Sequence, residues 1–309
     1  IVALGALSRL PKVLTEGVLA KDLDGVQIEE ILSQALFDRW NQVPAALAWN
    51  AVDPALTWNQ AFNNGLGEID AGNYELAARA ASVTDIYSLV SALATSGLGY
   101  LYENSAGQIS YADSTHRTQY LAANGYVNLS ANDAFASGLQ TAVRAGDVRN
   151  YITLTYKNAA QVTDSDATSI ALYGTLAQNI TTSLENGADA TSQAAFYLEL
   201  RAFPQANFNQ ISFPLGSPEI DNSDRDNLLS VFMGMPVNIS DLPENMGLNF
   251  QGFVEGWQFQ AGINSLTVSL YVTPVAYSLQ AFTWADVPVV ETWNTIEPTL
   301  EWLNATVVA

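Results

Sequence analysis

Two consecutive stretches in the last quarter of the chain alternate between apolar and polar residues, and this alternation constrains the fold more than any other feature. Successive side chains of a β-strand point to opposite faces, so a period of two residues predicts strands with one buried face. A turn over Gly262–Ser265 separates the stretches, so we expect a hairpin that forms half of a small barrel or sandwich. The apolar positions are Leu248, Phe250, Gly252 and Val254, then Leu266, Val268, Leu270 and Val272. We expect Val254 and the four later positions to be buried on the same face.

Three other segments have the residue spacing of amphipathic helices. They cover residues 24–37, 84–96 and 191–203. We expect Thr84 to be the N-cap of the second helix and Gly97 its C′ residue, and Pro204 to end the third. The expected apolar stripes are Ile28, Ile31, Leu32, Ala35 and Leu36, then Ile86, Leu89, Val90 and Leu93, then Ala195, Leu198 and Ala202.

Several shorter β-strands are expected between these helices. A hairpin is predicted over 98–111, because two aromatic-containing runs flank a short polar loop that ends in Gly107. Residues 148–156 alternate as a strand, and residues 169–173 are interpreted as another short one.

The composition limits what the chain can bind. The net charge is −20, which repels phosphate backbones and anionic membrane surfaces. The chain also contains 13 Tyr, 12 Phe and 7 Trp, enough aromatic surface to build a packed core. It has no Cys and one His, so thiolate sites and sites with two imidazoles are excluded. No stretch approaches the roughly 20 apolar residues of a membrane-spanning helix.

Six of the seven tryptophans form two triplets with the same nine-residue spacing. They are Trp40, Trp49 and Trp58, then Trp284, Trp293 and Trp302, and both triplets fit the pattern W-x2-V-P-x4-W-N-x3-P-x-L-x-W. The prolines and the spacing of nine disfavour a helix, so we expect two copies of one extended, turned path. The rings could fix irregular loops to the core, form an interface with another subunit or partner, or stack on carbohydrate. We treat all six as candidate interaction residues.

No catalytic, cofactor or metal motif can be assigned. His116 follows Ser114 and Thr115, but no G-x-S-x-G elbow is present, so we interpret it as a loop or surface residue. The acidic run Asp221–Asn227 lacks the Gly and the Glu of an EF-hand and is expected to be a solvated loop. Pairs of carboxylates such as Glu29 and Glu30 are common among 31 acidic residues. The residues therefore favour a structural or binding protein over an enzyme.

Three stretches, in this order, resemble the tail hub or minor tail proteins of tailed bacteriophages. The helix running into Gly99-Tyr-Leu-Tyr-Glu-Asn-Ser-Ala-Gly-Gln-Ile-Ser-Tyr111 is similar to the helix and hairpin of that family. Ile152–Tyr156, Ser169–Gly174 and Ala194–Pro204 are similar to its next segments. Gly234–Ile239 and Gly252–Gly256, continuing through 266–273, resemble its closing barrel.

The resemblance implies an α+β fold that is mainly β, with small β-barrel hub domains and α+β segments between them. Residues 2–10 would be the last strand of a truncated first barrel, which ends near residue 20. An α+β domain with the first Trp triplet would cover 21–146, a second α+β domain 147–235, the closing barrel 236–280 and a Trp-repeat extension 281–309.

The resemblance also implies a function. The chain would be a structural virion protein at the distal end of a phage tail, would form a homotrimeric ring and would contact tube, tip and receptor-binding proteins. DNA would pass through without specific binding, and no cofactor or enzymatic activity is implied. Two alternatives remain from the residues alone: an extracellular carbohydrate-binding module that uses the Trp arrays, and a glycosidase that uses two carboxylates.

Overall fold

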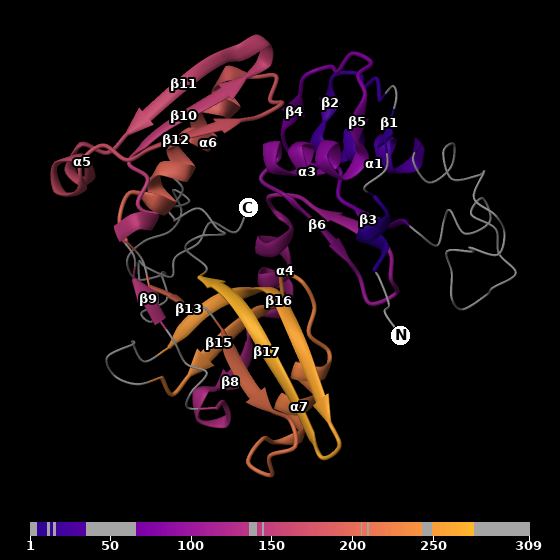
Figure 1. Cartoon of the computed structure of the whole chain (residues 1–309), viewed down its shortest axis with the longest axis vertical. Coiled ribbons are helices and arrows are strands. Elements are labelled where there is room, and N and C mark those ends of the chain that lie inside the picture. Colours follow the sequence, from indigo (N-terminus) through magenta and orange to yellow (C-terminus); the bar gives the residue numbers. More distant parts are fainter. Residues whose placement is uncertain are drawn as a thin grey trace, which may run out of the picture. The chain divides into compact units, whose positions relative to one another are not determined.

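The computed structural model describes residues 5–10, 13–14, 17–34, 66–135, 141–143, 145–204, 206–208, 210–242 and 249–274. The chain divides into two units that interleave along the sequence. Unit 1 takes residues 1–116 and 149–199, and unit 2 takes 117–148 and 200–309. The five consecutive segments expected from the sequence stay a prediction, and each unit is described here by itself (Figure 1).

Unit 1 is built from small sheets and the helices that pack on them. Its helices are η1 (Ala6–Arg9), α1 (Asp24–Gln34), α3 (Ile86–Ser96), η7 (Lys157–Ala159), α5 (Ala167–Tyr173) and most of α6 (Gly187–Arg201). Its two-stranded sheets pair β1 (Val13–Leu14) with β5 (Thr84–Asp85), and β2 (Asp22–Leu23) with β4 (Glu75–Leu76). Its three-stranded sheets are β3 (Leu66–Ile69), β7 (Ile109–Ala112) and β6 (Tyr100–Glu103), and β11 (Ala160–Ser165), β10 (Tyr151–Tyr156) and β12 (Ala177–Thr181), each given in spatial order.

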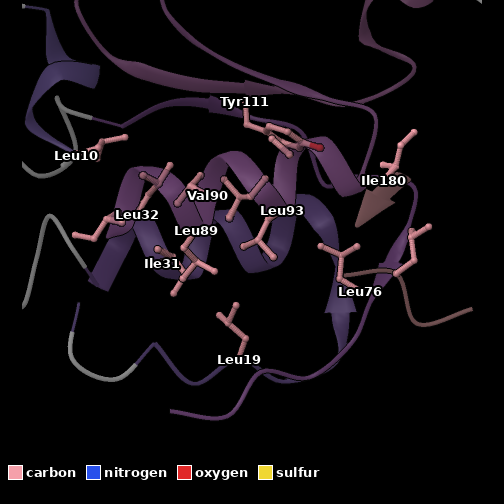
Figure 2. Close-up of a cluster of buried hydrophobic side chains, with 14 of the residues drawn as sticks. Leu10, Leu19, Ile31, Leu32, Leu76, Leu89, Val90, Leu93, Tyr111 and Ile180 are labelled. Carbon is pink, nitrogen blue, oxygen red and sulfur yellow. The ribbon is translucent and has the colours of Figure 1, made fainter. Parts of the chain in front are cut away.

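The core of unit 1 lies between α1 and α3. Figure 2 shows Leu89, Val90 and Leu93 of α3 beside Ile31 and Leu32 of α1, with Tyr111 of β7 over the helices. All of these side chains are buried, and so is Ile28, as the helical stripes predict. The predicted stripe residues Ala35 and Leu36 lie outside the described residues. Burial of such apolar surface is the main stabilising contribution of the helix pair.

The start and the end of α3 differ from the sequence prediction in one residue each. Asp85, not Thr84, is the N-cap: its carboxylate accepts a hydrogen bond from the Ser88 N–H at 2.8 Å, three residues on. At the other end Gly97 has a φ of −87°, and Leu98 takes the left-handed φ of 55° that was expected of the glycine. Gly97 is required for a different reason, because a Cβ there would overlap the carboxylate of Asp24.

The hairpin predicted over 98–111 is confirmed. Strands β6 and β7 pair antiparallel with Tyr100 opposite Ala112, and Gly107 in the loop has a φ of 74°. The strand predicted over 148–156 is present as β10.

Three expectations for other segments were wrong. Residues 6–9 form the 3-10 helix η1, so the described part of the expected barrel strand 2–10 is not extended, and the Gly5 carbonyl accepts from Ser8 N–H at 3.2 Å instead. Residues 169–173 belong to the helix α5, because Asp166 caps its first turn and Gly174, with a φ of 77°, ends it.

The third of these expectations concerned the helix over 191–203. It begins earlier, at Gly187, and Ala195 is exposed. The buried side is formed by Ala190, Ala194 and a polar residue, Gln193, whose amide donates to the Ser96 carbonyl at 2.7 Å. A buried polar residue is invisible to a pattern that counts apolar positions, which is why the predicted side was wrong.

Unit 2 is organised around one five-stranded sheet. In spatial order its strands are β14 (Ile211–Pro214), β17 (Ser265–Pro274), β16 (Phe250–Gly262), β15 (Pro236–Ser240) and β8 (Val127–Ser130). A separate pair joins β13 (Ala206–Phe208) to β9 (Thr141–Val143). The remaining elements are α4 (His116–Asn124), whose first residue belongs to unit 1, η4 (Ala131–Asp133), η6 (Ala145–Asp147) and α7 (Asn222–Leu229).

The described strands of this sheet do not close into a barrel, which corrects the barrel expected over 236–280. The sheet instead recruits β8 and β14 from earlier in the chain. None of the sheets described in unit 1 closes into a barrel either. The molecule is thus a mixed helix and sheet fold made mainly of small sheets.

The predicted buried face of the long hairpin is confirmed. Val254, Val268, Leu270 and Val272 are buried in one cluster, and Leu266 is half-buried against it. A β-bulge between Val254 and Gly256 inserts one extra residue, Glu255, in the first strand. The bulge changes the parity of the strand, so after Val254 the apolar face continues at Trp257.

Candidate functional site

The six tryptophans proposed as interaction residues all lie outside the described residues, so their role stays a prediction. The seventh, Trp257 of β16, is half-buried and packs against the core of the five-stranded sheet. Among the described residues, the features with a chemical character are two polar networks in unit 1, an ion pair in unit 2 and the exposed end of the β16–β17 hairpin.

The first network lies at the ends of two parallel strands. Strands β3 and β7 are parallel neighbours, so the residues that follow them, Asp70 and Asp113, lie at the same edge of the sheet. Asp70 Oδ2 accepts from the Asp113 N–H at 3.0 Å and lies 2.8 Å from Nδ1 of His116. Asp113 Oδ1 accepts from the N–H groups of Thr115 and His116 at 2.8 and 3.1 Å. The two carboxylates together fix the first turn of α4.

Charge in this network shifts two pKa values in opposite directions. The hydrogen bond to Asp70 outweighs burial and raises the pKa of His116, and the nearby carboxylates of Glu68 and Asp113 act in the same sense. Burial alone would raise the pKa of Asp70, but the bonds from His116 and Asp113 N–H outweigh it and lower the pKa. The pair is therefore an ion pair whenever the imidazole is protonated, and His116 is more than the loop or surface residue expected from the sequence.

The second network is a buried carboxylate among glycines. Asp24, at the first position of α1, accepts hydrogen bonds from the hydroxyl of Tyr111 and, at 2.8 Å, from the Tyr74 N–H. Cβ atoms at Gly72 or Gly97 would overlap its oxygens, so these glycines allow the backbone to enclose the carboxylate. Burial raises the pKa of Asp24 and, together with the charge of Asp24, that of Tyr111.

Unit 2 holds a two-bond ion pair beneath its long hairpin. Arg117 Nη1 and Nη2 donate to Glu255 Oε1 and Oε2 at 2.7 and 2.9 Å. The guanidinium also lies 5.3 Å from the ring centroid of Phe253, which faces away from the main core with Leu121 and Tyr126 packed on it. Because Glu255 is the bulge residue, the ion pair attaches α4 to the irregular point of β16.

Sequence reasoning missed Asp24, Tyr111, Arg117 and Glu255. The only signal was that each is a charged or hydroxyl-bearing residue beside apolar neighbours in a predicted element, a weak signal because every exposed strand or helix has such residues. Their partners lie 87 and 138 positions apart, and no local pattern connects positions at that separation.

The acidic run Asp221–Asn227 is helical rather than a solvated loop. Asp221 is the N-cap of α7, accepting from the Asp224 N–H at 2.8 Å. Burial and the charges of Asp221 and Asp133 raise the pKa of Asp224. In the part of the chain that the structure describes, no three His, Asp or Glu side chains come close enough to hold a metal ion. The helices in that part are also too short or too polar to cross a membrane.

The exposed end of the β16–β17 hairpin is the most apolar solvent-facing feature of unit 2 (Figure 1). Ile263 in its turn is fully exposed, and Phe259 and Tyr271 are exposed to about 40%. Residues 256–274 contain no charged side chain. Exposed apolar residues on a projecting, uncharged element are typical of a contact surface.

Comparison with known proteins shows what the fold is similar to. No family model and no curated protein matches the sequence. Among solved structures, the 43 kDa tail protein of prophage MuSo2 from Shewanella oneidensis is 11% identical, with a TM-score of 0.50 over 85% of this chain and 66% of that one. The tail protein from Neisseria meningitidis MC58 is 10% identical, with a TM-score of 0.50 over 84% of this chain and 69% of that one. The chain thus spans about two-thirds of the length of these proteins and is similar to them in fold.

Proposed function

We propose that this chain is a structural protein of a bacteriophage tail. The observation that carries the proposal is the fold similarity to two tail proteins over more than four-fifths of the chain. Because the sequences are only 10–11% identical, the similarity concerns the fold, and the function comes to this chain as a proposal.

Within the tail, we place the chain at the distal end as the hub that joins the tail tube to the tip and receptor-binding proteins. The order of its three hub-like stretches supports this position. In this role it forms a homotrimeric ring through which DNA passes. A net charge of −20 per chain suits that passage, because a negative lumen repels phosphates and prevents DNA from sticking.

The test is to locate the chain in particles of the phage that encodes it. Tryptic peptides of the chain are expected in purified tails, and antibody labelling should place it at the tail tip. Particles made without the chain should lack a completed tip. Labelling along the tube would contradict the hub position, and absence of the chain from purified particles would contradict the tail function altogether.

The Trp triplets are proposed as the docking element for neighbouring tail proteins. In that case Trp293→Ala should reduce incorporation into particles more than it lowers the stability of the isolated chain. Trp257→Ala is the matched control: its ring packs on the sheet core, so it should lower stability first. If Trp293→Ala lowers stability and incorporation equally, its ring only completes the core. Retention of the isolated chain on glycans, abolished by Trp293→Ala, would favour the carbohydrate-binding alternative.

A further inference from the structure

One side of β16 has no strand partner in the described part of unit 2 over most of the strand's length. Strand β15 pairs with β16 only through residues 250–253, and Val254 then exchanges backbone hydrogen bonds with Gly234 and Met235. From Glu255 to Gly262, β17 is the only described strand that pairs with β16, on its other side. Eight residues of strand cover about 26 Å, which leaves a long row of backbone donors and acceptors for another strand.

This edge lacks the features by which proteins normally prevent edge pairing. Charged side chains, prolines and covering loops protect most exposed edges. Residues 256–262 contain neither charge nor proline, and residues 258–262 are exposed. The one charge nearby, on Glu255, is bound to Arg117. By contrast, β11 of unit 1 carries Asp164 along its length and is also an edge strand of its sheet.

The absence of charge also indicates what the edge binds. The chain has 31 acidic and 11 basic residues, yet residues 256–285 contain none of either. A basic partner would be attracted by acidic side chains, which this region does not provide. A second copy of the chain carries the same charge of −20, and it can approach closely only where both surfaces are uncharged.

We infer that the open edge of β16, residues 255–262, pairs with a β-strand of a second copy of this chain, so that one sheet runs across the subunit boundary. The exposed Phe259 and Ile263 then become buried at the contact. The inference deepens the proposed function by naming the ring contact, and it rests on that function only for the ring; the edge and its lack of charge belong to the chain itself.

The experiment measures self-association of the full chain by sedimentation across a concentration series, with amide hydrogen exchange of each sample. The wild-type chain should associate, and amides of residues 255–262 should gain protection as concentration rises. The test variant is Gln258→Lys with Gln260→Lys, two exposed positions on this strand. We expect its dissociation constant to rise about tenfold or more, because two pairs of like charges would face each other across the contact.

Two features make the result decisive. The double variant has a net charge of −18, which by itself eases association, so weaker association can only come from the edge. The matched control, Gln161→Lys, makes the same change on the edge strand β11 and should associate like wild type. Unchanged unfolding of the double variant shows that the monomer is intact.

Three results would overturn the inference: a chain that is monomeric at every concentration, an association that the double variant leaves unchanged, or protection of 255–262 that is independent of concentration. The last would mean that this chain's own residues occupy the edge. A monomeric chain that is nevertheless found in tails would remove the inference and leave the proposed function. An edge-paired oligomer that is absent from tails would do the reverse.

Discussion

Arg117 and Glu255, 138 positions apart in the sequence, are joined by two parallel hydrogen bonds of 2.7 and 2.9 Å. The arginine side chain is 12% exposed and the glutamate 31% exposed, so solvent screens the pair only in part. His116, one residue earlier, is bound to Asp70 in unit 1. Two consecutive residues of α4 are thus held by carboxylates of different units, and the chain changes unit at the peptide bond between them.

Replacing Glu255 with Gln should destabilise unit 2 by about 1–3 kcal/mol, because a mostly buried guanidinium loses its counter-charge. Arg117→Lys should cost a similar amount, since an ammonium cannot donate two parallel bonds. Urea unfolding monitored in unit 2 measures both. The exposed pair of Lys21 and Glu75, 2.9 Å apart, is the control, and Lys21→Ala should leave unfolding unchanged. Equal effects at the two pairs would contradict the importance of the Arg117 bonds.

Tyr111→Phe should destabilise unit 1 by about 1–3 kcal/mol, because the buried Asp24 carboxylate loses a donor. Asp24→Asn removes the buried charge and keeps the shape. Burial raises the folded-state pKa of Asp24, so its contribution to stability is greatest below the unfolded value of 3.8 and falls as pH rises through the folded value. The Asn variant should therefore be less sensitive to pH between 4 and 7.

A double-mutant cycle of these two positions, followed by chemical unfolding at pH 7, tests whether the residues act together. Tyr111→Phe should cost less in the Asp24→Asn background than in the wild type. Additive effects would show that the hydroxyl contributes independently of the carboxylate.

The N-cap of α3 can be assigned by mutation. Asp85→Ala should lower the free energy of unfolding by about 1 kcal/mol, because the Ser88 N–H loses its acceptor. Thr84→Ala, one residue earlier, should have a smaller effect. Thermal unfolding of both variants distinguishes the two positions, and a larger loss for Thr84→Ala would restore the cap expected from the sequence.

The His116–Asp70 pair should make unit 1 more stable in weakly acidic solution. The raised pKa of His116 means that its contribution is fully present below the unfolded value of 6.5 and is lost as pH rises through the folded value. The lowered pKa of Asp70 means that its contribution is present above 3.8 and is lost as pH falls through its own folded value. The wild type should therefore exceed His116→Gln in stability most clearly near pH 5 to 6, and the difference should shrink above pH 8.

Because the chain has one histidine, NMR can follow its imidazole titration without overlap from another. The measured pKa should lie above 6.5 in wild type and move down in Asp70→Asn. A wild-type pKa at or below 6.5 would mean that the bond to Asp70 does not hold in solution.

Val268→Asp should cost several kcal/mol, because it places an unpaired charge in the core of the five-stranded sheet. Asn264→Asp, which adds the same charge at the exposed turn of the same hairpin, is the control and should leave unfolding unchanged. Unchanged melting of the Val268→Asp chain would show that the assigned register of β17 is wrong.

The sequence alone determined the local elements whose apolar residues follow one period. The stripe of α1, the buried face of α3, the hairpin closed by Gly107 and the alternation of β17 were all predicted, because burial of one face requires side chains at a fixed spacing. The helix α5 was misread as a strand, because in seven residues both periods place apolar side chains almost equally well. The Trp triplets stay a prediction.

Only the tertiary structure decided how distant segments combine. The five-stranded sheet draws β8 from more than a hundred residues before β16, and it stays open where a barrel was expected. Asp24 with Tyr111, His116 with Asp70 and Arg117 with Glu255 became partners because buried or half-buried charges need compensation wherever the chain brings them together. The open edge of β16 has the same origin, since an edge exists only once it is known which strands pair. Local spacing is written in neighbouring residues, whereas pairing between distant strands and charges is set by packing of the whole unit.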